Sequence, residues 1–319
     1  MAHDVYGTAD VLELRDLPDP TPGPGEVVVG IEAASLNAAD WHFLTGTPLF
    51  ARIAFGLRRP RRTVPGVDLT GTVMALGPDV VDLAVGDAVV GWREGGALAE
   101  LAVVPSDQLV RRPDSVTIQH AATLGVAAFT ALQGLRDVGA LVAGEKVLVK
   151  GASGGVGTFA VQIAAVLGAD VTAVCSTPNV ETVRSLGANR VIDYRNDHVF
   201  DGERYDLLLD IAGPETYADC RAALTDAGRH VLVGGPKGRI LGPIPYFVAA
   251  KLRSIPASQS FTTFVSSENR ADLQTLVDWV AEGAITPVID RTFPLVDAAD
   301  AMRYQGEGHS RGKIVVTMS

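Results

Sequence analysis

Residues 146–157 read KVLVKGASGGVG, where a short apolar strand leads into a glycine-rich turn and then into a helix. The spacing is Ala152-x-Gly154-x-x-Gly157, with alanine where the commonest dinucleotide fingerprint has its first glycine. Glycines allow a tight turn, and the N–H groups and dipole at a helix start attract an anion. The pattern predicts a turn that holds the pyrophosphate of a dinucleotide, and a purely structural turn is the alternative. The expected binding residues are Ser153, Gly154, Gly155, Val156 and Gly157.

Strand-like and helical segments alternate around this turn. Strands are predicted over 146–150, 170–175, 190–192, 207–210 and 230–233, and helices over 121–135, 158–167 and 180–186. Such alternation is typical of βαβ units, which build the doubly wound parallel sheet of a Rossmann domain. The first hundred residues instead carry short β-branched runs at 26–31, 71–77 and 87–92, bounded by glycine and proline. They predict a β-rich, barrel-like unit. Together with the Rossmann domain, this unit makes α/β the predicted fold class.

Composition limits the classes of function. The 319 residues carry a net charge of −10, which argues against nucleic acid because binding a phosphate backbone needs a basic surface. No uninterrupted apolar run is long enough for a membrane-spanning helix, and the amino terminus shows no secretory signal. The two cysteines, Cys175 and Cys220, are too far apart for a disulfide framework. We therefore expect a soluble, cytoplasmic protein that handles a small molecule, without a membrane partner.

One basic segment stands out in this acidic chain. Residues 51–62 carry five arginines among apolar residues: Arg52, Arg58, Arg59, Arg61 and Arg62. Two interpretations are open, a solvated helix or loop and a surface that binds an anion or a partner.

The end of the second predicted strand bears on the choice of cofactor. NAD-selective sites usually have Asp or Glu about 20 residues after the glycine turn, where it binds the ribose 2′-hydroxyl. Here the strand ends in Cys175, Ser176 and Thr177, with no carboxylate. The two hydroxyls can donate hydrogen bonds to a 2′-phosphate, which favours NADPH. NADH stays possible, because no arginine or lysine adjoins them.

Ordered motifs along essentially the whole chain resemble those of a known family. They lie at residues 19–27, 34–40, 64–71, 85–89, 151–157, 186–194 and 312–316. They resemble the medium-chain dehydrogenase/reductase superfamily, and within it the zinc-independent quinone oxidoreductase branch that includes zeta-crystallin. The resemblance implies a discontinuous β-rich, GroES-like catalytic domain, residues 1–121 and 259–319, around a Rossmann domain, residues 122–258. It also implies an active site in the cleft between the domains, and a homodimer through the edge of the Rossmann sheet, to which residues 260–265 could contribute.

The residues at the positions of the family's zinc ligands predict a metal-free site. Zinc-dependent relatives have cysteine at the position of Asn37 and histidine at the position of Val67. No four clustered cysteines follow Gly86 to form a structural zinc lobe. A catalytic zinc needs about three protein ligands, and Asp40 and Asp68 alone do not supply them.

Without a Lewis acid, the easiest acceptors are electron-poor quinones and α,β-unsaturated carbonyls. The resemblance implies that Asn37 lines the nicotinamide pocket, and Asn37 could donate a hydrogen bond to a carbonyl oxygen that gains charge. His42 is the nearest candidate proton donor. The alternatives are an Asn37 that only caps a helix and a His42 that belongs to a packed aromatic cluster.

The resemblance assigns three further residues to the cofactor. Thr130 matches a threonine at the nicotinamide and its ribose, Tyr194 a tyrosine near the adenosine phosphate, and Gly234 a glycine under the nicotinamide. The function expected is thus an NADPH-dependent, zinc-free reductase of quinones or enones. Two alternatives stay open: a metal-free NAD(P)-dependent alcohol or carbonyl dehydrogenase, and a non-catalytic dinucleotide-binding protein.

Overall fold

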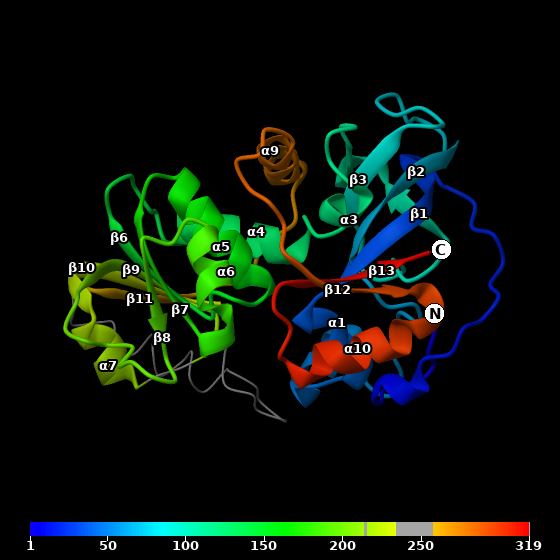
Figure 1. The fold of residues 1–319 in the computed structure, drawn as a ribbon. Coiled ribbons are helices and arrows are strands. Elements are labelled where there is room, and N and C mark those ends of the chain that lie inside the picture. Colours follow the sequence, from blue (N-terminus) through cyan, green and yellow to red (C-terminus); the bar gives the residue numbers. More distant parts are fainter. Residues whose placement is uncertain (214–215, 234–257, 319) are drawn as a thin grey trace. The chain divides into compact units, whose positions relative to one another are not determined.

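The computed structural model describes residues 1–213, 216–233 and 258–318, and it divides the chain into two compact units (Figure 1). The β-rich unit comprises residues 1–129 and 268–319, and the Rossmann unit comprises residues 130–267. The divisions thus lie further along the chain than 121/122 and 258/259, the boundaries expected from the sequence. The first falls within one continuous helix, α4 (Val126–Gln133), and the second lies beyond a strand, β11 (Ser260–Thr263), that joins the Rossmann sheet.

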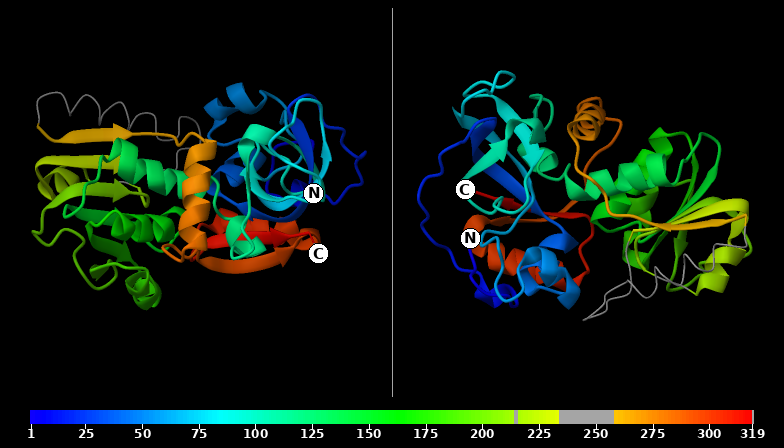
Figure 2. Two further views of the ribbon diagram at one scale, coloured as in Figure 1. Left: turned by 90° about the horizontal axis from the view of Figure 1, so that it is seen from above. Right: turned by 180° about the vertical axis from the view of Figure 1, so that it is seen from behind.

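The Rossmann unit is built on one six-stranded parallel sheet. Its other strands are β6 (Lys146–Lys150), β7 (Asp170–Cys175), β8 (Arg190–Asp193), β9 (Tyr205–Asp210) and β10 (Leu224–Leu232). The spatial order is β11-β10-β9-β6-β7-β8, and every neighbouring pair is parallel. Numbered within the unit, this is the order of a doubly wound dinucleotide-binding sheet, which confirms the predicted fold class. Figure 2 shows β11 at the edge of the sheet beside β10.

Helices connect these strands. They are α5 (Gly155–Val166), α6 (Val180–Ser185), α7 (Tyr217–Ala222), the 3₁₀ turn η5 (Thr177–Asn179) and the π-helical turn η4 (Gly134–Val138). The first of them, α5, follows β6 directly and buries Phe159, Ala160 and Ile163 completely. Strands that are apolar on both faces, such as β6 with Val147, Leu148 and Val149 all at 0 % exposure, are typical of parallel sheets.

The β-rich unit contains a seven-stranded sheet in the order β12-β13-β1-β2-β3-β5, with β4 paired to β1. Its strands are β1 (Glu26–Leu36), β2 (Asp68–Leu76), β3 (Ala88–Trp92), β4 (Leu101–Pro105), β5 (Leu109–Arg111), β12 (Ile289–Pro294) and β13 (Lys313–Thr317). Since β13 pairs with β1, the two ends of the chain build one sheet, with Ala34 opposite Val316. The discontinuous unit expected from the resemblance is therefore present.

Helices complete the β-rich unit. They are α1 (Ala38–Thr45), α2 (Arg52–Phe55), α3 (Ile118–Ala121), α9 (Arg270–Ala281) and α10 (Ala298–Glu307), with 3₁₀ turns η1 (Ala9–Val11), η2 (Leu49–Ala51), η3 (Ser106–Gln108) and η6 (Leu295–Asp297). α1 and α10 contact each other beside β12 and β13 (Figure 1). The helix predicted over 121–135 is broken into α3, α4 and η4. Among the described residues, no helix has the length and apolarity needed to cross a bilayer.

Candidate active site

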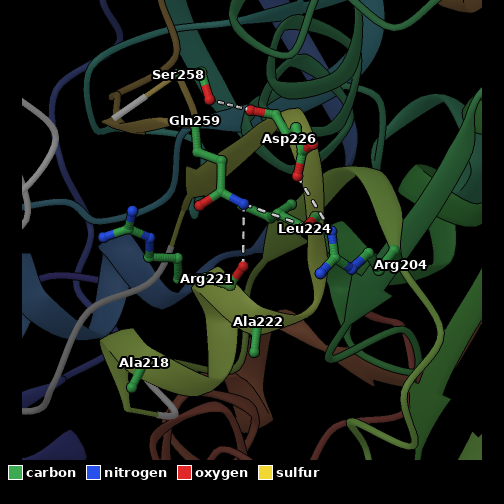
Figure 3. A pocket seen from close by; sticks show the side chains of 8 residues that line it. All are labelled: Arg204, Ala218, Arg221, Ala222, Leu224, Asp226, Ser258 and Gln259. Carbon is green, nitrogen blue, oxygen red and sulfur yellow. Dashed lines mark hydrogen bonds and ion pairs between the residues drawn. The ribbon is translucent and has the colours of Figure 1, made fainter. Parts of the chain in front are cut away.

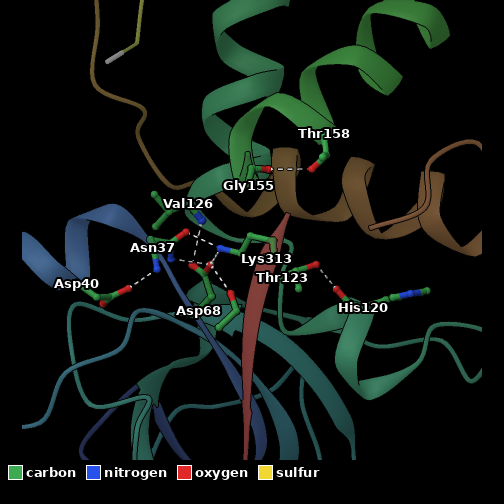
Figure 4. A network of polar contacts seen from close by, with 10 residues as sticks. Asn37, Asp40, Asp68, His120, Thr123, Val126, Gly155, Thr158 and Lys313 are labelled. Carbon is green, nitrogen blue, oxygen red and sulfur yellow. Dashed lines mark hydrogen bonds and ion pairs between the residues drawn. The ribbon is translucent and has the colours of Figure 1, made fainter. Parts of the chain in front are cut away.

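A buried polar network surrounds Asp68, the first residue of β2 (Figure 4). Its Oδ2 accepts hydrogen bonds from Ser35 Oγ at 3.0 Å and from Asn37 Nδ2 at 2.9 Å, and it lies 3.2 Å from Lys313 Nζ. Its Oδ1 accepts the backbone N–H of Val126, the first residue of α4, at 2.9 Å. Asp68 is fully buried and the Lys313 residue is 2 % exposed. An isolated charge at this depth would be costly, so the two charges depend on each other.

Sheet register brings these residues together. Ser35 lies opposite Asp68 in the β1–β2 pair and opposite Val315 in the β1–β13 pair. The end of β1 therefore lies between the start of β2 and the start of β13. Gly125 leaves room for the carboxylate, because a Cβ at this position would lie 2.0 Å from Asp68 Oδ1. The glycine and the cap on Val126 give a physical reason for the break between α3 and α4.

The carboxamide of Asn37 is held in one orientation. Lys313 Nζ donates to Asn37 Oδ1 at 2.5 Å, while Asn37 Nδ2 donates to Asp68. Because an ammonium can only donate and a carboxylate only accepts, the amide cannot be flipped. One of the two Nδ2 hydrogens bonds Asp68, and among the described residues no acceptor takes the second. Asn37 is also the N-cap residue of α1, so the capping alternative and the donor role are compatible.

Asp40, in the first turn of α1, closes the network from the helix side. Its Oδ2 accepts the backbone N–H of Asn37 at 2.7 Å. Burial raises the pKa of Asp40 to about 7, and the charge of Asp68 adds to this rise. The Asn37 N–H and the Lys313 ammonium lower the pKa and oppose the effect of burial. Asp40 is thus a buried carboxyl group that ionises near neutral pH.

His42 does not belong to this network. It lies in the last turn of α1, its side chain is exposed, and its carbonyl oxygen accepts the N–H of Gly46 and of Thr47. Its proposed role as a proton donor stays a prediction.

The donor set around Asp68 does not fit a catalytic zinc. Asn37 Oδ1 and Asp68 Oδ2 both already bind the Lys313 ammonium. A dication beside this lysine would meet a like charge, and Asn37 and Val67 stand where zinc-dependent relatives have cysteine and histidine.

A second buried cluster contains possible metal ligands. Asp210, Cys220 and His230 place one ligand atom each within 4.8 Å of one another. Lys150 Nζ lies 3.3 Å from Asp210 Oδ2 and also donates to the carbonyl oxygen of Gly213. Lys150 therefore balances the charge of Asp210, just as Lys313 balances the charge of Asp68.

The glycine turn has the geometry expected of a pyrophosphate site. Gly151 has φ +81°, and Ala152 N–H bonds the carbonyl oxygen of Val174 at 3.0 Å, which ties the turn to β7. Gly154 is the N-cap residue of α5, so the N–H groups of the next residues have no acceptor within the helix. A Cβ at Gly157 would lie 2.1 Å from the Gly151 carbonyl oxygen, whereas one at Gly154 would approach nothing closer than 3.7 Å. Of Gly154 and Gly157, the fold itself therefore requires only Gly157.

This difference separates binding from folding. Gly154→Ala should leave the free energy of unfolding within about 1 kcal/mol of wild type, because its backbone is extended and its surroundings are open. It should weaken dinucleotide binding at least ~10-fold, since the new methyl group would occupy the space in which a pyrophosphate approaches the backbone. Gly157→Ala should instead destabilise the fold by about 1–3 kcal/mol, because backbone must move. Denaturant unfolding and cofactor fluorescence titration measure both effects. Equal effects of the two variants on stability would contradict this assignment.

A carboxylate that is distant in sequence, that of Asp193, lies at the predicted 2′-phosphate subsite. Asp193, the last residue of β8, lies opposite Cys175 of β7, directly before Ser176 and Thr177. The Thr177 hydroxyl bonds Asp193 and is the largest of the interactions that lower the pKa of its carboxyl group. Asn196 Nδ2 also donates to it at 2.6 Å. The sequence prediction of a subsite without a carboxylate is thus incomplete.

The structure gives these contacts for the other predicted cofactor residues. Ser176 accepts a hydrogen bond from Asn179 Nδ2 at 3.0 Å, and the exposed Tyr194 follows β8. Thr130 Oγ1 pairs with Ser266 Oγ at 2.9 Å. Gly234 lies outside the described residues.

The Rossmann unit also has a surface hollow of about 430 Å³ beside α7 (Figure 3). Its lining includes Arg204, Leu224 and Gln259, and Arg204 forms an ion pair with Asp226. These residues lie where β9, β10 and β11 begin, whereas the glycine turn follows the carboxyl end of β6. The hollow is therefore separate from the dinucleotide site.

Comparison with known proteins agrees with this architecture. Residues 23–114 match the alcohol dehydrogenase GroES-like domain, and residues 186–316 match the family described as zinc-binding dehydrogenase. The chloroplast envelope quinone oxidoreductase homolog of Arabidopsis thaliana is 35 % identical over 97 % of this chain and 95 % of its own length. The trans-enoyl reductase pgmF of Aspergillus terreus is 33 % identical over 92 % of this chain and 86 % of its own. The solved quinone oxidoreductase of Coxiella burnetii superposes with a TM-score of 0.87 at 26 % identity, covering 100 % of this chain and 98 % of that one.

Fold and relatives together define a medium-chain dehydrogenase/reductase, a class of NAD(P)H-dependent oxidoreductases. Within this superfamily the chain belongs to the quinone oxidoreductase branch.

Proposed function

We propose that this protein is an NADPH-dependent oxidoreductase that transfers hydride to quinones or α,β-unsaturated carbonyls without a catalytic zinc. The observation that carries the proposal is the fixed carboxamide of Asn37. Lys313 and Asp68 hold it, and within the described part of the chain its second N–H has no acceptor. Relatives named quinone oxidoreductase and trans-enoyl reductase support these two acceptor classes.

The residues of the network have complementary roles in this chemistry. A bound nicotinamide supplies the hydride. The free Nδ2–H of Asn37 donates to the acceptor oxygen, which gains negative charge as hydride arrives at carbon or at the ring. The ammonium of Lys313 on Oδ1 draws electron density from the amide and makes this N–H a stronger donor. Asp68 prevents rotation of the amide, so the donor is oriented before the reaction begins.

Replacing Asn37 tests the donor role. Asn37→Ala should lower kcat about 10²-fold, because a preorganised donor to a developing oxyanion typically contributes this much. Cofactor affinity should change less than ~3-fold, because the side chain acts on the acceptor. Steady-state kinetics and a fluorescence titration with the cofactor separate the two. Unchanged turnover would reduce Asn37 to a helix cap.

A panel of acceptors tests the reaction class. The purified protein should oxidise NADPH with 9,10-phenanthrenequinone or a 2-alkenal, and a chelator should not change the rate. Alcohol oxidation that a chelator abolishes, with no turnover of either acceptor, would refute the proposal. Chelator-insensitive alcohol oxidation alone would indicate a metal-free alcohol dehydrogenase. Cofactor binding without turnover of any substrate would indicate a non-catalytic dinucleotide-binding protein.

The preference for NADPH rests on the Ser176 and Thr177 hydroxyls. The carboxylate of Asp193 opposes it, because it accepts the one hydroxyl hydrogen of Thr177 and carries a like charge to a 2′-phosphate. Asp193→Asn should therefore tighten NADPH binding about tenfold, since removing one nearby charge favours a phosphate dianion by ~1–2 kcal/mol. NADH binding should hardly change. Asp170→Asn is a matched control, because Asp170 begins β7 at the opposite end of the strand. An equal gain for both cofactors would show that Asp193 does not face the 2′-phosphate. The homodimer, the cytoplasmic location and the role of His42 stay predictions.

A further inference from the structure

Residues 49–62, which we call the arginine segment, combine exposed apolar side chains with exposed arginines. From Trp41 to Val67 the sequence contains five arginines and no Asp or Glu, although the whole chain has a net charge of −10. The exposed apolar residues of the arginine segment, with the exposed fraction of each, are Leu49 (41 %), Phe50 (38 %), Ile53 (72 %) and Leu57 (71 %). Arg58, Arg59, Arg61 and Arg62 are exposed as well, and Arg62 forms a surface ion pair with Glu94.

The opposite side of the segment is firmly anchored. Arg52 Nε donates to the carbonyl oxygen of Gly46 at 2.9 Å, and its guanidinium lies 4.4 Å from the centre of the Tyr6 ring. Tyr6 in turn donates its hydroxyl to the carbonyl oxygen of Gly56 at 2.6 Å. Phe55 packs edge-on against Phe43 of α1, with ring centres 4.4 Å apart. These contacts fix the backbone of the segment, from which the side chains of Ile53 and Leu57 are exposed to solvent.

We propose that the arginine segment docks this protein on the surface of an anionic lipid bilayer. Arginines beside exposed aliphatic side chains are typical of surfaces that insert apolar groups among lipid headgroups while cations bind the headgroup charge. A nucleic acid would use the charges but leave the apolar side chains in water. A protein interface is usually a larger, shape-complementary patch, rich in aromatic side chains at its core. The exposed apolar and arginine side chains thus argue against the expectation, drawn from the sequence, that the protein has no membrane partner. This inference does not depend on the proposed activity.

The test is flotation of the full chain with lipid vesicles. Wild type should bind vesicles of phosphatidylcholine with 30 % phosphatidylserine at 0.1 M NaCl, and at least ~10-fold less at 0.5 M NaCl or with pure phosphatidylcholine. Arg58→Glu/Arg59→Glu should lower binding at least ~25-fold, at about fivefold for each arginine. Ile53→Ser/Leu57→Ser should lower it ~10-fold or more, because the lost insertion is apolar.

Two matched pairs control for charge and for apolar exposure. Arg204→Glu/Arg221→Glu makes the same change in net charge on the Rossmann unit, and Val81→Ser/Val296→Ser removes exposed apolar side chains elsewhere. Both should bind vesicles within ~2-fold of wild type. No binding of wild type to anionic vesicles at low salt would overturn the proposal, as would equal losses in the control pairs. Circular dichroism confirms that each variant is folded, which these exposed positions favour.

Discussion

Lys313→Met is expected to destabilise the protein by about 3–5 kcal/mol and to abolish most of its reductase activity. The substitution leaves the fully buried Asp68 without its cation, and breaking a buried ion pair from one side typically costs this much. It also removes the donor to Asn37 Oδ1, so the carboxamide loses its fixed orientation. Denaturant unfolding and kcat with 9,10-phenanthrenequinone measure the two losses, and we expect kcat to fall at least ~10²-fold.

Two comparisons make this result specific. Lys146→Met removes a half-exposed lysine that pairs with Glu203, and an ion pair at the surface contributes only about 0–1 kcal/mol. Adding Asp68→Asn to Lys313→Met should recover part of the lost stability, because no unpaired carboxylate is left buried. Activity should not return, because the donor to Asn37 is still missing. A Lys313→Met variant as stable as Lys146→Met would show that Asp68 does not need the lysine.

The Rossmann unit could be predicted from the sequence because its signals are local. The strand, glycine turn and helix around Gly154 and Gly157 adjoin one another in the chain, and the alternation of the flanking segments indicates the parallel sheet. The edge strand β11 joins the Rossmann sheet, although the resemblance implies that residues 259–319 belong to the β-rich unit. Its short β-branched run does not reveal which of two sheets it joins.

The polar network could be predicted only in part, because sheet register and not sequence proximity creates it. Asn37 was predicted as an active-site residue, but its partners Asp68 and Lys313 lie 31 and 276 residues away. A lysine at the start of the apolar run Lys313–Thr317 was an available signal, since a strand buried along its length cannot leave a charge unpaired. The place of Asp193 beside Thr177 cannot be predicted from the sequence for the same reason, because only the pairing of β7 with β8 brings the two residues together.

Asp40→Asn is expected to change how stability depends on pH. In the folded chain, burial raises the pKa of Asp40 to about 7, well above the ordinary value of an unfolded aspartate. Between these two values the folded state keeps a proton that the unfolded state has released. The contribution of Asp40 to the free energy of unfolding therefore falls as pH rises from about 4 to about 7, and it falls no further above this range. Asn at this position does not titrate, so the variant lacks this contribution.

From pH 5 to pH 8, the free energy of unfolding of Asp40→Asn should therefore rise by about 3 kcal/mol relative to that of wild type. The change is ~1.4 kcal/mol for each pH unit below the folded pKa. Denaturant unfolding of both proteins at several pH values measures it. Asp87→Asn is a control of opposite sign, because the Ala84 N–H and Arg111 hold the pKa of Asp87 below its ordinary value. Below about pH 4 this variant should lose stability relative to wild type as pH rises, and from pH 5 to pH 8 the difference should stay constant. A stability difference for Asp40→Asn that is independent of pH would mean that Asp40 ionises in the fold as it does in the unfolded chain. Lys313 and the Asn37 N–H would then stabilise its carboxylate as strongly as burial penalises it.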